Sequence, residues 1–127
     1  MIQALFVSTA RTSFSDMDSA FADNNAETVW AESGVDALMM IQARSFDLIV
    51  ADEVLPDMTG LHLARNLISK NPMLNIAVVS TLSSKDFHEA SEGLGILMQL
   101  PPIPQKSDAE KLLEHLKHIL TLTEKTN

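Results

Sequence analysis

One segment of the sequence, residues 47–60, limits the folds available to the chain more than any other. It opens with a run of branched apolar residues, Leu48 to Val50, which is typical of a strand buried on both faces in a parallel sheet. The run stops before Asp52, so a carboxylate is expected at the carboxyl end of a central strand, where ligands bind in open α/β sheets. Pro56 then ends the strand direction, and Thr59-Gly60 leads into a helix. The segment therefore predicts a functional site at Asp52.

Strands and helices alternate along the rest of the chain. Short apolar runs predict strands over residues 2–7, 28–31, 47–52, 76–79 and 96–100. Apolar residues at helical spacing predict helices that begin near Phe14, Ser33, Gly60, Lys85 and Ser107. Five strands alternating with five helices predict a parallel sheet with right-handed crossovers and helices on both faces. The fold class is therefore α/β, doubly wound and flavodoxin-like, with strand order 2-1-3-4-5.

Two predictions concern single helices. The apolar residues of the second helix are expected to form its buried face: Val35, Leu38, Met39, Met40 and Ile41. In the last helix, Ser107 and Glu110 match a capping box, in which a serine hydroxyl and a glutamate carboxylate accept backbone N–H groups at the helix start.

The composition excludes several classes of function. A length of 127 residues suits one domain, which we assign to residues 1–122, with a frayed tail at 123–127. The net charge of −8, from 17 acidic and 9 basic residues, argues against nucleic-acid binding, because phosphate contacts need clustered Lys and Arg. There is no cysteine, and the apolar start is too short for a signal peptide or a membrane span. We therefore expect a cytoplasmic protein without membrane association.

The segment around Asp52 resembles the core motif of bacterial response-regulator receiver domains, the CheY-like family. That motif is an apolar strand, a phosphoacceptor Asp, three residues, a Pro, and a Gly four positions further on. Asp52 matches the phosphoacceptor, and Pro56 and Gly60 match the loop positions. Ser80 matches the Ser or Thr that hydrogen-bonds the phosphoryl group. The resemblance implies two-component signal transduction by a domain that is not an enzyme.

The resemblance is incomplete where the family binds Mg²⁺. Receivers hold the cation with the central Asp and an acidic pair at the end of the first strand, but this sequence has Ser8-Thr9 there. Hydroxyl groups are weak neutral ligands, so the resemblance implies that Asp52 keeps at most a weakened Mg²⁺ site. Glu53 and Asp57 are the available substitutes, and both are weak because of their positions. A separate hypothesis is that Arg11 pairs with Asp52 and replaces the cation.

A second departure follows the fifth strand, where the family has a Lys-Pro pair. The chain has Leu100-Pro101-Pro102, so the Lys position falls on Leu100 or Pro101, and Lys106 comes too late to match. The switch aromatic of the family falls on Leu97 or Met98. An X-Pro bond in this segment is a candidate for the cis form.

We therefore interpret the chain as a degenerate receiver that acts mainly as a protein-interaction module with a vestigial phosphoacceptor. The resemblance implies a histidine kinase, another receiver or an output domain as partner, and it allows a homodimer. The expected interface comprises Leu100, Pro101, Pro102 and Ile103. One alternative is an active receiver that is phosphorylated on Asp52 by a histidine kinase through an unusual Mg²⁺ site. Another is a flavodoxin-like domain that binds a ligand with the hydroxyl-rich loop Ser8–Ser13.

Overall fold

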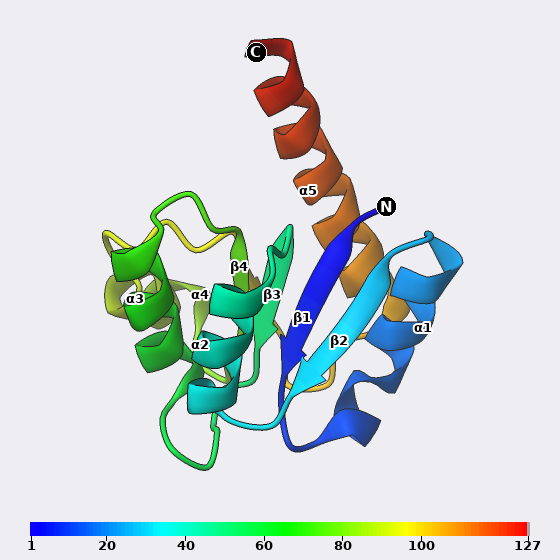
Figure 1. Cartoon of the computed structure of the whole chain (residues 1–127). Coiled ribbons are helices and arrows are strands. Elements are labelled where there is room, and N and C mark those ends of the chain that lie inside the picture. Colours follow the sequence, from blue (N-terminus) through cyan, green and yellow to red (C-terminus); the bar gives the residue numbers. More distant parts are fainter. Residues whose placement is uncertain (127) are drawn as a thin grey trace.

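The sheet has five parallel strands in the order β2-β1-β3-β4-β5 (Figure 1). The computed structural model describes residues 1–126, with side chains through residue 122. The strands are β1 (Gln3–Val7), β2 (Glu27–Ala31), β3 (Leu48–Ala51), β4 (Ile76–Val79) and β5 (Met98–Leu100). This confirms the predicted fold class and strand order. The fifth strand starts two residues later than the sequence predicts.

The helices form a layer on each face of the sheet. They are a 3₁₀ helix (Arg11–Phe14), α1 (Ser15–Asp23), α2 (Gly34–Ala43), α3 (Gly60–Lys70), α4 (Ser84–Ala90) and α5 (Lys106–Thr126). In Figure 1, α1 and α5 cover one face, while α2, α3 and α4 cover the other. No helix in the described part of the chain is long and apolar enough to cross a membrane.

An aromatic cluster fills the core under α1 and α5. The ring of Phe6 on β1 meets three other rings edge-on, with centroid distances of 5.7 Å to Phe14, 5.0 Å to Phe21 and 5.1 Å to Trp30. Edge-to-face contacts of this kind stabilise aromatic pairs beyond the area that they bury. Phe6 therefore connects the inner strand β1 to the 3₁₀ helix, α1 and β2.

The prediction for α2 is wrong at two residues. Val35 and Met39 are 52% and 63% exposed, and the residues that α2 buries are Gly34 and Ala37. Gly34 lies directly against the side chain of Met58, so a Cβ atom at this position would force that side chain to move. Small residues thus let the helix approach its neighbours closely, and the larger apolar side chains lie on its flanks or in solvent.

The capping box predicted for α5 is also wrong. The helix begins at Lys106, and the Asp108 carboxylate accepts the Gln105 N–H at 2.9 Å. The reciprocal acid is therefore Asp108, two residues before Glu110, and Ser107 lies inside the first turn. The helix continues through Thr126 over most of the predicted tail, while Asn127 lies outside the described residues. Its last turns extend beyond the edge of the sheet in Figure 1.

Candidate functional site

Asp52 and Ser8 lie side by side because they follow the paired strands β3 and β1. The Asp52 N–H donates to the Val7 carbonyl oxygen at 2.9 Å and extends the pairing of the two strands. The Ser8 hydroxyl donates to Asp52 Oδ2 at 2.7 Å, and Ser8 is completely buried. Thr9, the other hydroxyl residue at this position, is exposed. The structure therefore brings Ser8, and not Thr9, to the candidate phosphoacceptor.

Both carboxylate oxygens of Asp52 accept hydrogen bonds. While Oδ2 accepts the Ser8 hydroxyl, Oδ1 accepts the Glu53 N–H at 2.8 Å. The Ser8 oxygen in turn accepts the Ala10 N–H at 2.9 Å, so its orientation is fixed from both sides. Asp52 is half-buried, and its carboxylate is held by neutral donors.

The two acidic residues near Asp52 are bound to other parts of the protein. Glu53 Oε2 accepts both the Thr81 N–H at 2.7 Å and the Thr81 hydroxyl at 2.9 Å. The two oxygens of Asp57 accept the N–H groups of Gly34 and Val35, each at 2.9 Å. These backbone bonds at the start of α2 lower the pKa of Asp57 below its ordinary value of 3.8.

The loop from β3 to α3 explains the spacing of Pro56 and Gly60. The Leu55 N–H donates to the Met58 carbonyl oxygen at 2.9 Å, which closes a tight turn around Pro56. The Gly60 N–H then donates to the Glu53 carbonyl oxygen at 2.9 Å, and a Cβ atom on Gly60 would overlap the carbonyl oxygen of Asp52. Only glycine allows the chain to return this close to Asp52.

Ser80 lies at the carboxyl end of β4, as the sequence predicts. It is 6% exposed, and its hydroxyl oxygen accepts the Leu82 N–H at 3.1 Å. Ser80 therefore lies on the same edge of the sheet as Asp52.

The predicted interface segment is buried at its first residue. Leu100 is 1% exposed and ends β5, so its assignment to an interface is wrong. Leu100 ends the strand that pairs with β4, and its side chain packs in the core cluster under α5. Pro101, Pro102 and Ile103 are exposed, and Pro101 is the residue that directly follows the strand. None of the described peptide bonds is cis, so the bonds before Pro101 and Pro102 are trans.

Arg11 does not pair with Asp52. Its guanidinium lies over the Trp30 ring at 5.0 Å from the centroid, and no ion pair of Arg11 is found among residues 1–122. The pairing hypothesis is therefore wrong. The loop after β1 forms a 3₁₀ helix over Arg11–Phe14, and its buried hydroxyl, that of Ser8, is bound to Asp52. This geometry weakens the case for a ligand bound by the hydroxyl-rich loop.

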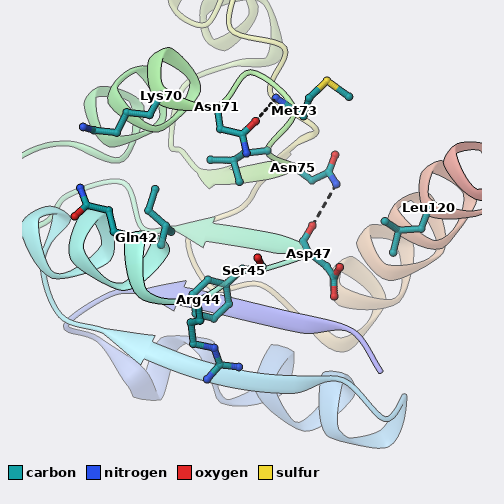
Figure 2. Close-up of a pocket in the computed structure, with 12 residues that line it drawn as sticks. Gln42, Arg44, Ser45, Asp47, Lys70, Asn71, Met73, Asn75 and Leu120 are labelled. Atoms are coloured by element: carbon teal, nitrogen blue, oxygen red, sulfur yellow. Dashed lines mark hydrogen bonds between the residues drawn. The ribbon is translucent and has the colours of Figure 1, made fainter.

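A separate pocket of about 440 Å³ lies at the opposite edge of the sheet (Figure 2). The Asn71 side-chain oxygen accepts the Met73 N–H at 3.0 Å, and the Asn75 amide donates to the Asp47 carbonyl oxygen at 3.2 Å. Asp47 precedes β3 while Asp52 follows it, so this pocket is remote from the candidate site.

The sequence pattern does not single out Thr81 or Gln99, which lie near the edge of the sheet that carries Asp52 and Ser80. The Gln99 amide donates to the Leu82 carbonyl oxygen at 2.8 Å. Thr81 could have been found, because residues that follow neighbouring parallel strands meet at one edge. Gln99 carries no such signal, since it lies within the predicted fifth strand.

The strand order, with Asp52 after β3 and Ser80 after β4, is that of the CheY-like flavodoxin fold. The family described as "Response regulator receiver domain" matches residues 5–117, so the chain belongs to the response regulator receiver domain family. The chain is thus a receiver domain of two-component signalling, a type of module that is typically non-enzymatic.

Sequence and structure relatives agree with this family. The chain is 33% identical over 78 residues to the Regulator of RpoS of Escherichia coli strain K12. That match covers 61% of this chain but only 23% of the relative. In fold, the chain is similar to the chemotaxis response regulator CheY4 of Vibrio cholerae, with a TM-score of 0.80 and 22% identity over 91% of this chain and 98% of that one. It is also similar to NtrX of Brucella abortus, with a TM-score of 0.83 and 17% identity over 98% of this chain and 29% of that one.

Proposed function

We propose that this receiver domain acts as a protein-interaction module whose output does not depend on phosphorylation of Asp52. The observation that carries the proposal is the hydrogen bond from the buried Ser8 hydroxyl to Asp52 Oδ2 at 2.7 Å. In the family, this position belongs to an acidic pair that holds Mg²⁺. Here a neutral donor occupies it and bonds the phosphoacceptor itself.

The remaining acidic residues support the same proposal. A hard cation such as Mg²⁺ is usually held by carboxylates, together with phosphate oxygens of the substrate. Glu53 is bound to Thr81, and Asp57 is bound to the start of α2. Among the side chains of residues 1–122, no group of three or more His, Cys, Asp or Glu residues is arranged to hold a metal ion. The residues present thus do not fit a strong Mg²⁺ site.

The end of β5 adds a further argument. Most of the catalysis in phosphoryl transfer comes from placing positive charge around the moving phosphoryl group. The lysine position of the family falls on Leu100 or on Pro101, the residue after β5, and neither side chain carries a charge. Asp52 therefore retains its position in the fold, while the groups that would make it reactive are replaced.

The partner follows from the family and from the exposed surface. We assign residues 1–122 to the receiver unit and expect a histidine kinase, another receiver or an output domain as its partner in the cytoplasm. Exposed Pro101, Pro102 and Ile103 form the contact surface that we propose, and a homodimer through it is one possible arrangement. The similarity to the relative named Regulator of RpoS supports a regulatory role.

The intact mass of the protein after incubation with acetyl phosphate and Mg²⁺ tests the proposal. We expect no phosphoryl adduct on folded wild-type protein, and none on Asp52→Asn. A matched variant combines Ser8→Asp, Thr9→Asp and Pro101→Lys, which places an acidic pair and an ammonium group around Asp52. This variant should form an adduct that disappears when Asp52→Asn is added to it.

The result that would overturn the proposal is an adduct on the wild type that Asp52→Asn lacks. The chain would then be an active receiver with an unusual cation site. The positions of Asp52 and Ser80 at the same edge of the sheet favour this second candidate.

A further inference from the structure

The loop from β4 to α4, residues 80–83, is held to the sheet by an anionic side chain. Glu53 Oε2 accepts two hydrogen bonds from one residue of this loop, the Thr81 N–H at 2.7 Å and the Thr81 hydroxyl at 2.9 Å. Bonds to an ionised carboxylate are shorter and stronger than bonds between neutral groups. Glu53 thus gives two charge-assisted hydrogen bonds to a loop whose residues after Ser80 are exposed.

Other contacts fix the loop on both sides of Thr81. The Gln99 side chain on β5 donates to the Leu82 carbonyl oxygen at 2.8 Å, and the Leu82 N–H donates to the Ser80 hydroxyl oxygen at 3.1 Å. The next residue, Ser83, accepts the Asp86 N–H at 3.1 Å and caps α4. These hydrogen bonds involve successive residues from Ser80 to Ser83 and connect the β3–α3 loop, through Glu53, to the first turn of α4.

The position of Glu53 relates these hydrogen bonds to the candidate phosphoacceptor. Glu53 directly follows Asp52, so its carboxylate provides a negative charge and oxygen acceptors one residue away from the phosphoacceptor. A phosphoryl group on Asp52 would provide the same chemistry, charged oxygens that accept N–H and O–H donors. In this chain, the N–H and hydroxyl donors of Thr81 are already bound to the Glu53 carboxylate.

We propose that Glu53 is a built-in anionic anchor that holds the β4–α4 loop in one conformation without phosphorylation. The anchor also orients Leu82, which is 41% exposed and lines an apolar cavity of about 320 Å³ together with Glu53 and Val54. This inference deepens the proposed function, because it names the residue that replaces the phosphoryl signal. Its test requires no phosphoryl donor, so its failure is distinct from failure of the proposed function.

Amide hydrogen exchange, measured by NMR on unphosphorylated protein without Mg²⁺, tests the anchor. In Glu53→Ala, the Thr81 amide should exchange at least about tenfold faster than in the wild type, because its charged acceptor is lost. Glu53→Gln keeps the shape and an acceptor oxygen but removes the charge, so it should give an intermediate rate. The Val50 amide in the central strand should exchange at an unchanged rate in both variants and thereby report an intact fold.

Asp57→Ala is the matched control, because Asp57 is a second carboxylate of the same β3–α3 loop with different backbone partners. It should accelerate exchange at Gly34 and Val35 and leave Thr81 unchanged. If Thr81 exchanges in Glu53→Ala at the wild-type rate, the anchor does not exist. Equal acceleration of Thr81 in Glu53→Ala and Asp57→Ala would also overturn the proposal, because the effect would then belong to the whole loop.

Discussion

At position 60 the chain has no room for a side chain, since a Cβ atom there would overlap the carbonyl oxygen of Asp52. The obstacle is backbone, and it belongs to the residue that the site depends on. Any side chain at this position must displace the β3–α3 loop or the start of α3. At the scale of single residues, the glycine of the motif thus preserves the position of Asp52.

We expect Gly60→Ala to lower the free energy of unfolding by about 1–3 kcal/mol, the usual cost of forcing extra atoms into a packed site. Urea denaturation measures this loss. Gly34→Ala is the matched control, because its Cβ atom would meet the Met58 side chain, which is flexible and can move aside. Equal losses in the two variants would contradict the explanation from backbone overlap.

Single residues of the site differ in how far the sequence predicts them. The edge position of Asp52 follows from a strand pattern and the topology, so it could be predicted. The bonds of Ser8 to Asp52 and of Glu53 to Thr81 could not, because they depend on side-chain orientations that a pattern of residue types does not encode. The Arg11 hypothesis is wrong for the same reason, since the guanidinium has an aromatic ring within reach as well as a carboxylate.

At the scale of elements, the β3–α3 loop also provides hydrogen-bond acceptors for the start of α2. Asp57 accepts the N–H groups of Gly34 and Val35, which a helix start leaves without partners inside the helix. The Ser33 hydroxyl accepts a third such group, the Asp36 N–H at 3.0 Å. The loop therefore connects the site edge to a helix that is distant in sequence.

The lowered pKa of Asp57 makes this connection dependent on pH. A carboxylate with a lower pKa in the folded state stabilises the fold above its ordinary pKa of 3.8, and this contribution is lost as the pH falls through the folded-state value. We expect Asp57→Asn to melt below the wild type at neutral pH, with the difference shrinking in acid. Melting temperatures of both proteins across the acid range measure it, and a difference that stays constant into strong acid would contradict the prediction.

The elements themselves are predicted better than their faces and ends. The strand order and the helix positions follow from hydrophobic runs and from turn residues. The buried face of α2 is wrong at Val35 and Met39, because periodicity assigns large apolar residues to the core, whereas close packing here favours Gly34 and Ala37. For α5, the sequence predicts Glu110 as the acid that accepts an N–H group at the helix start, whereas the structure has Asp108, two residues earlier. The prediction fails because more than one acidic residue near the helix start can take this role.

At the scale of the whole molecule, Phe6 holds together the half of the core that contains β1, β2 and α1. It is fully buried and contacts the rings of Phe14, Phe21 and Trp30. Ser8 directly follows β1, so the packing of Phe6 on this strand also helps to position the Ser8 hydroxyl beside Asp52. A loss in this cluster should therefore weaken the whole domain.

We expect Phe6→Ala to lower the free energy of unfolding by about 3–5 kcal/mol, the usual cost of a buried Phe-to-Ala change. Urea denaturation followed by circular dichroism should show an earlier, single transition. Val54→Ala is the control, because Val54 is 69% exposed and its truncation should change stability by less than about 0.5 kcal/mol. A loss for Phe6→Ala as small as that of the control would contradict the role of the cluster.

The position of Trp30 gives the protein an intrinsic optical probe of its own site. It is the only tryptophan in the chain, and the guanidinium that covers its ring belongs to the loop that begins at Ser8. Its emission therefore reports on the environment of one ring, beside the loop that contacts Asp52. A cation or a partner that rearranges this loop would change the fluorescence of the unlabelled protein.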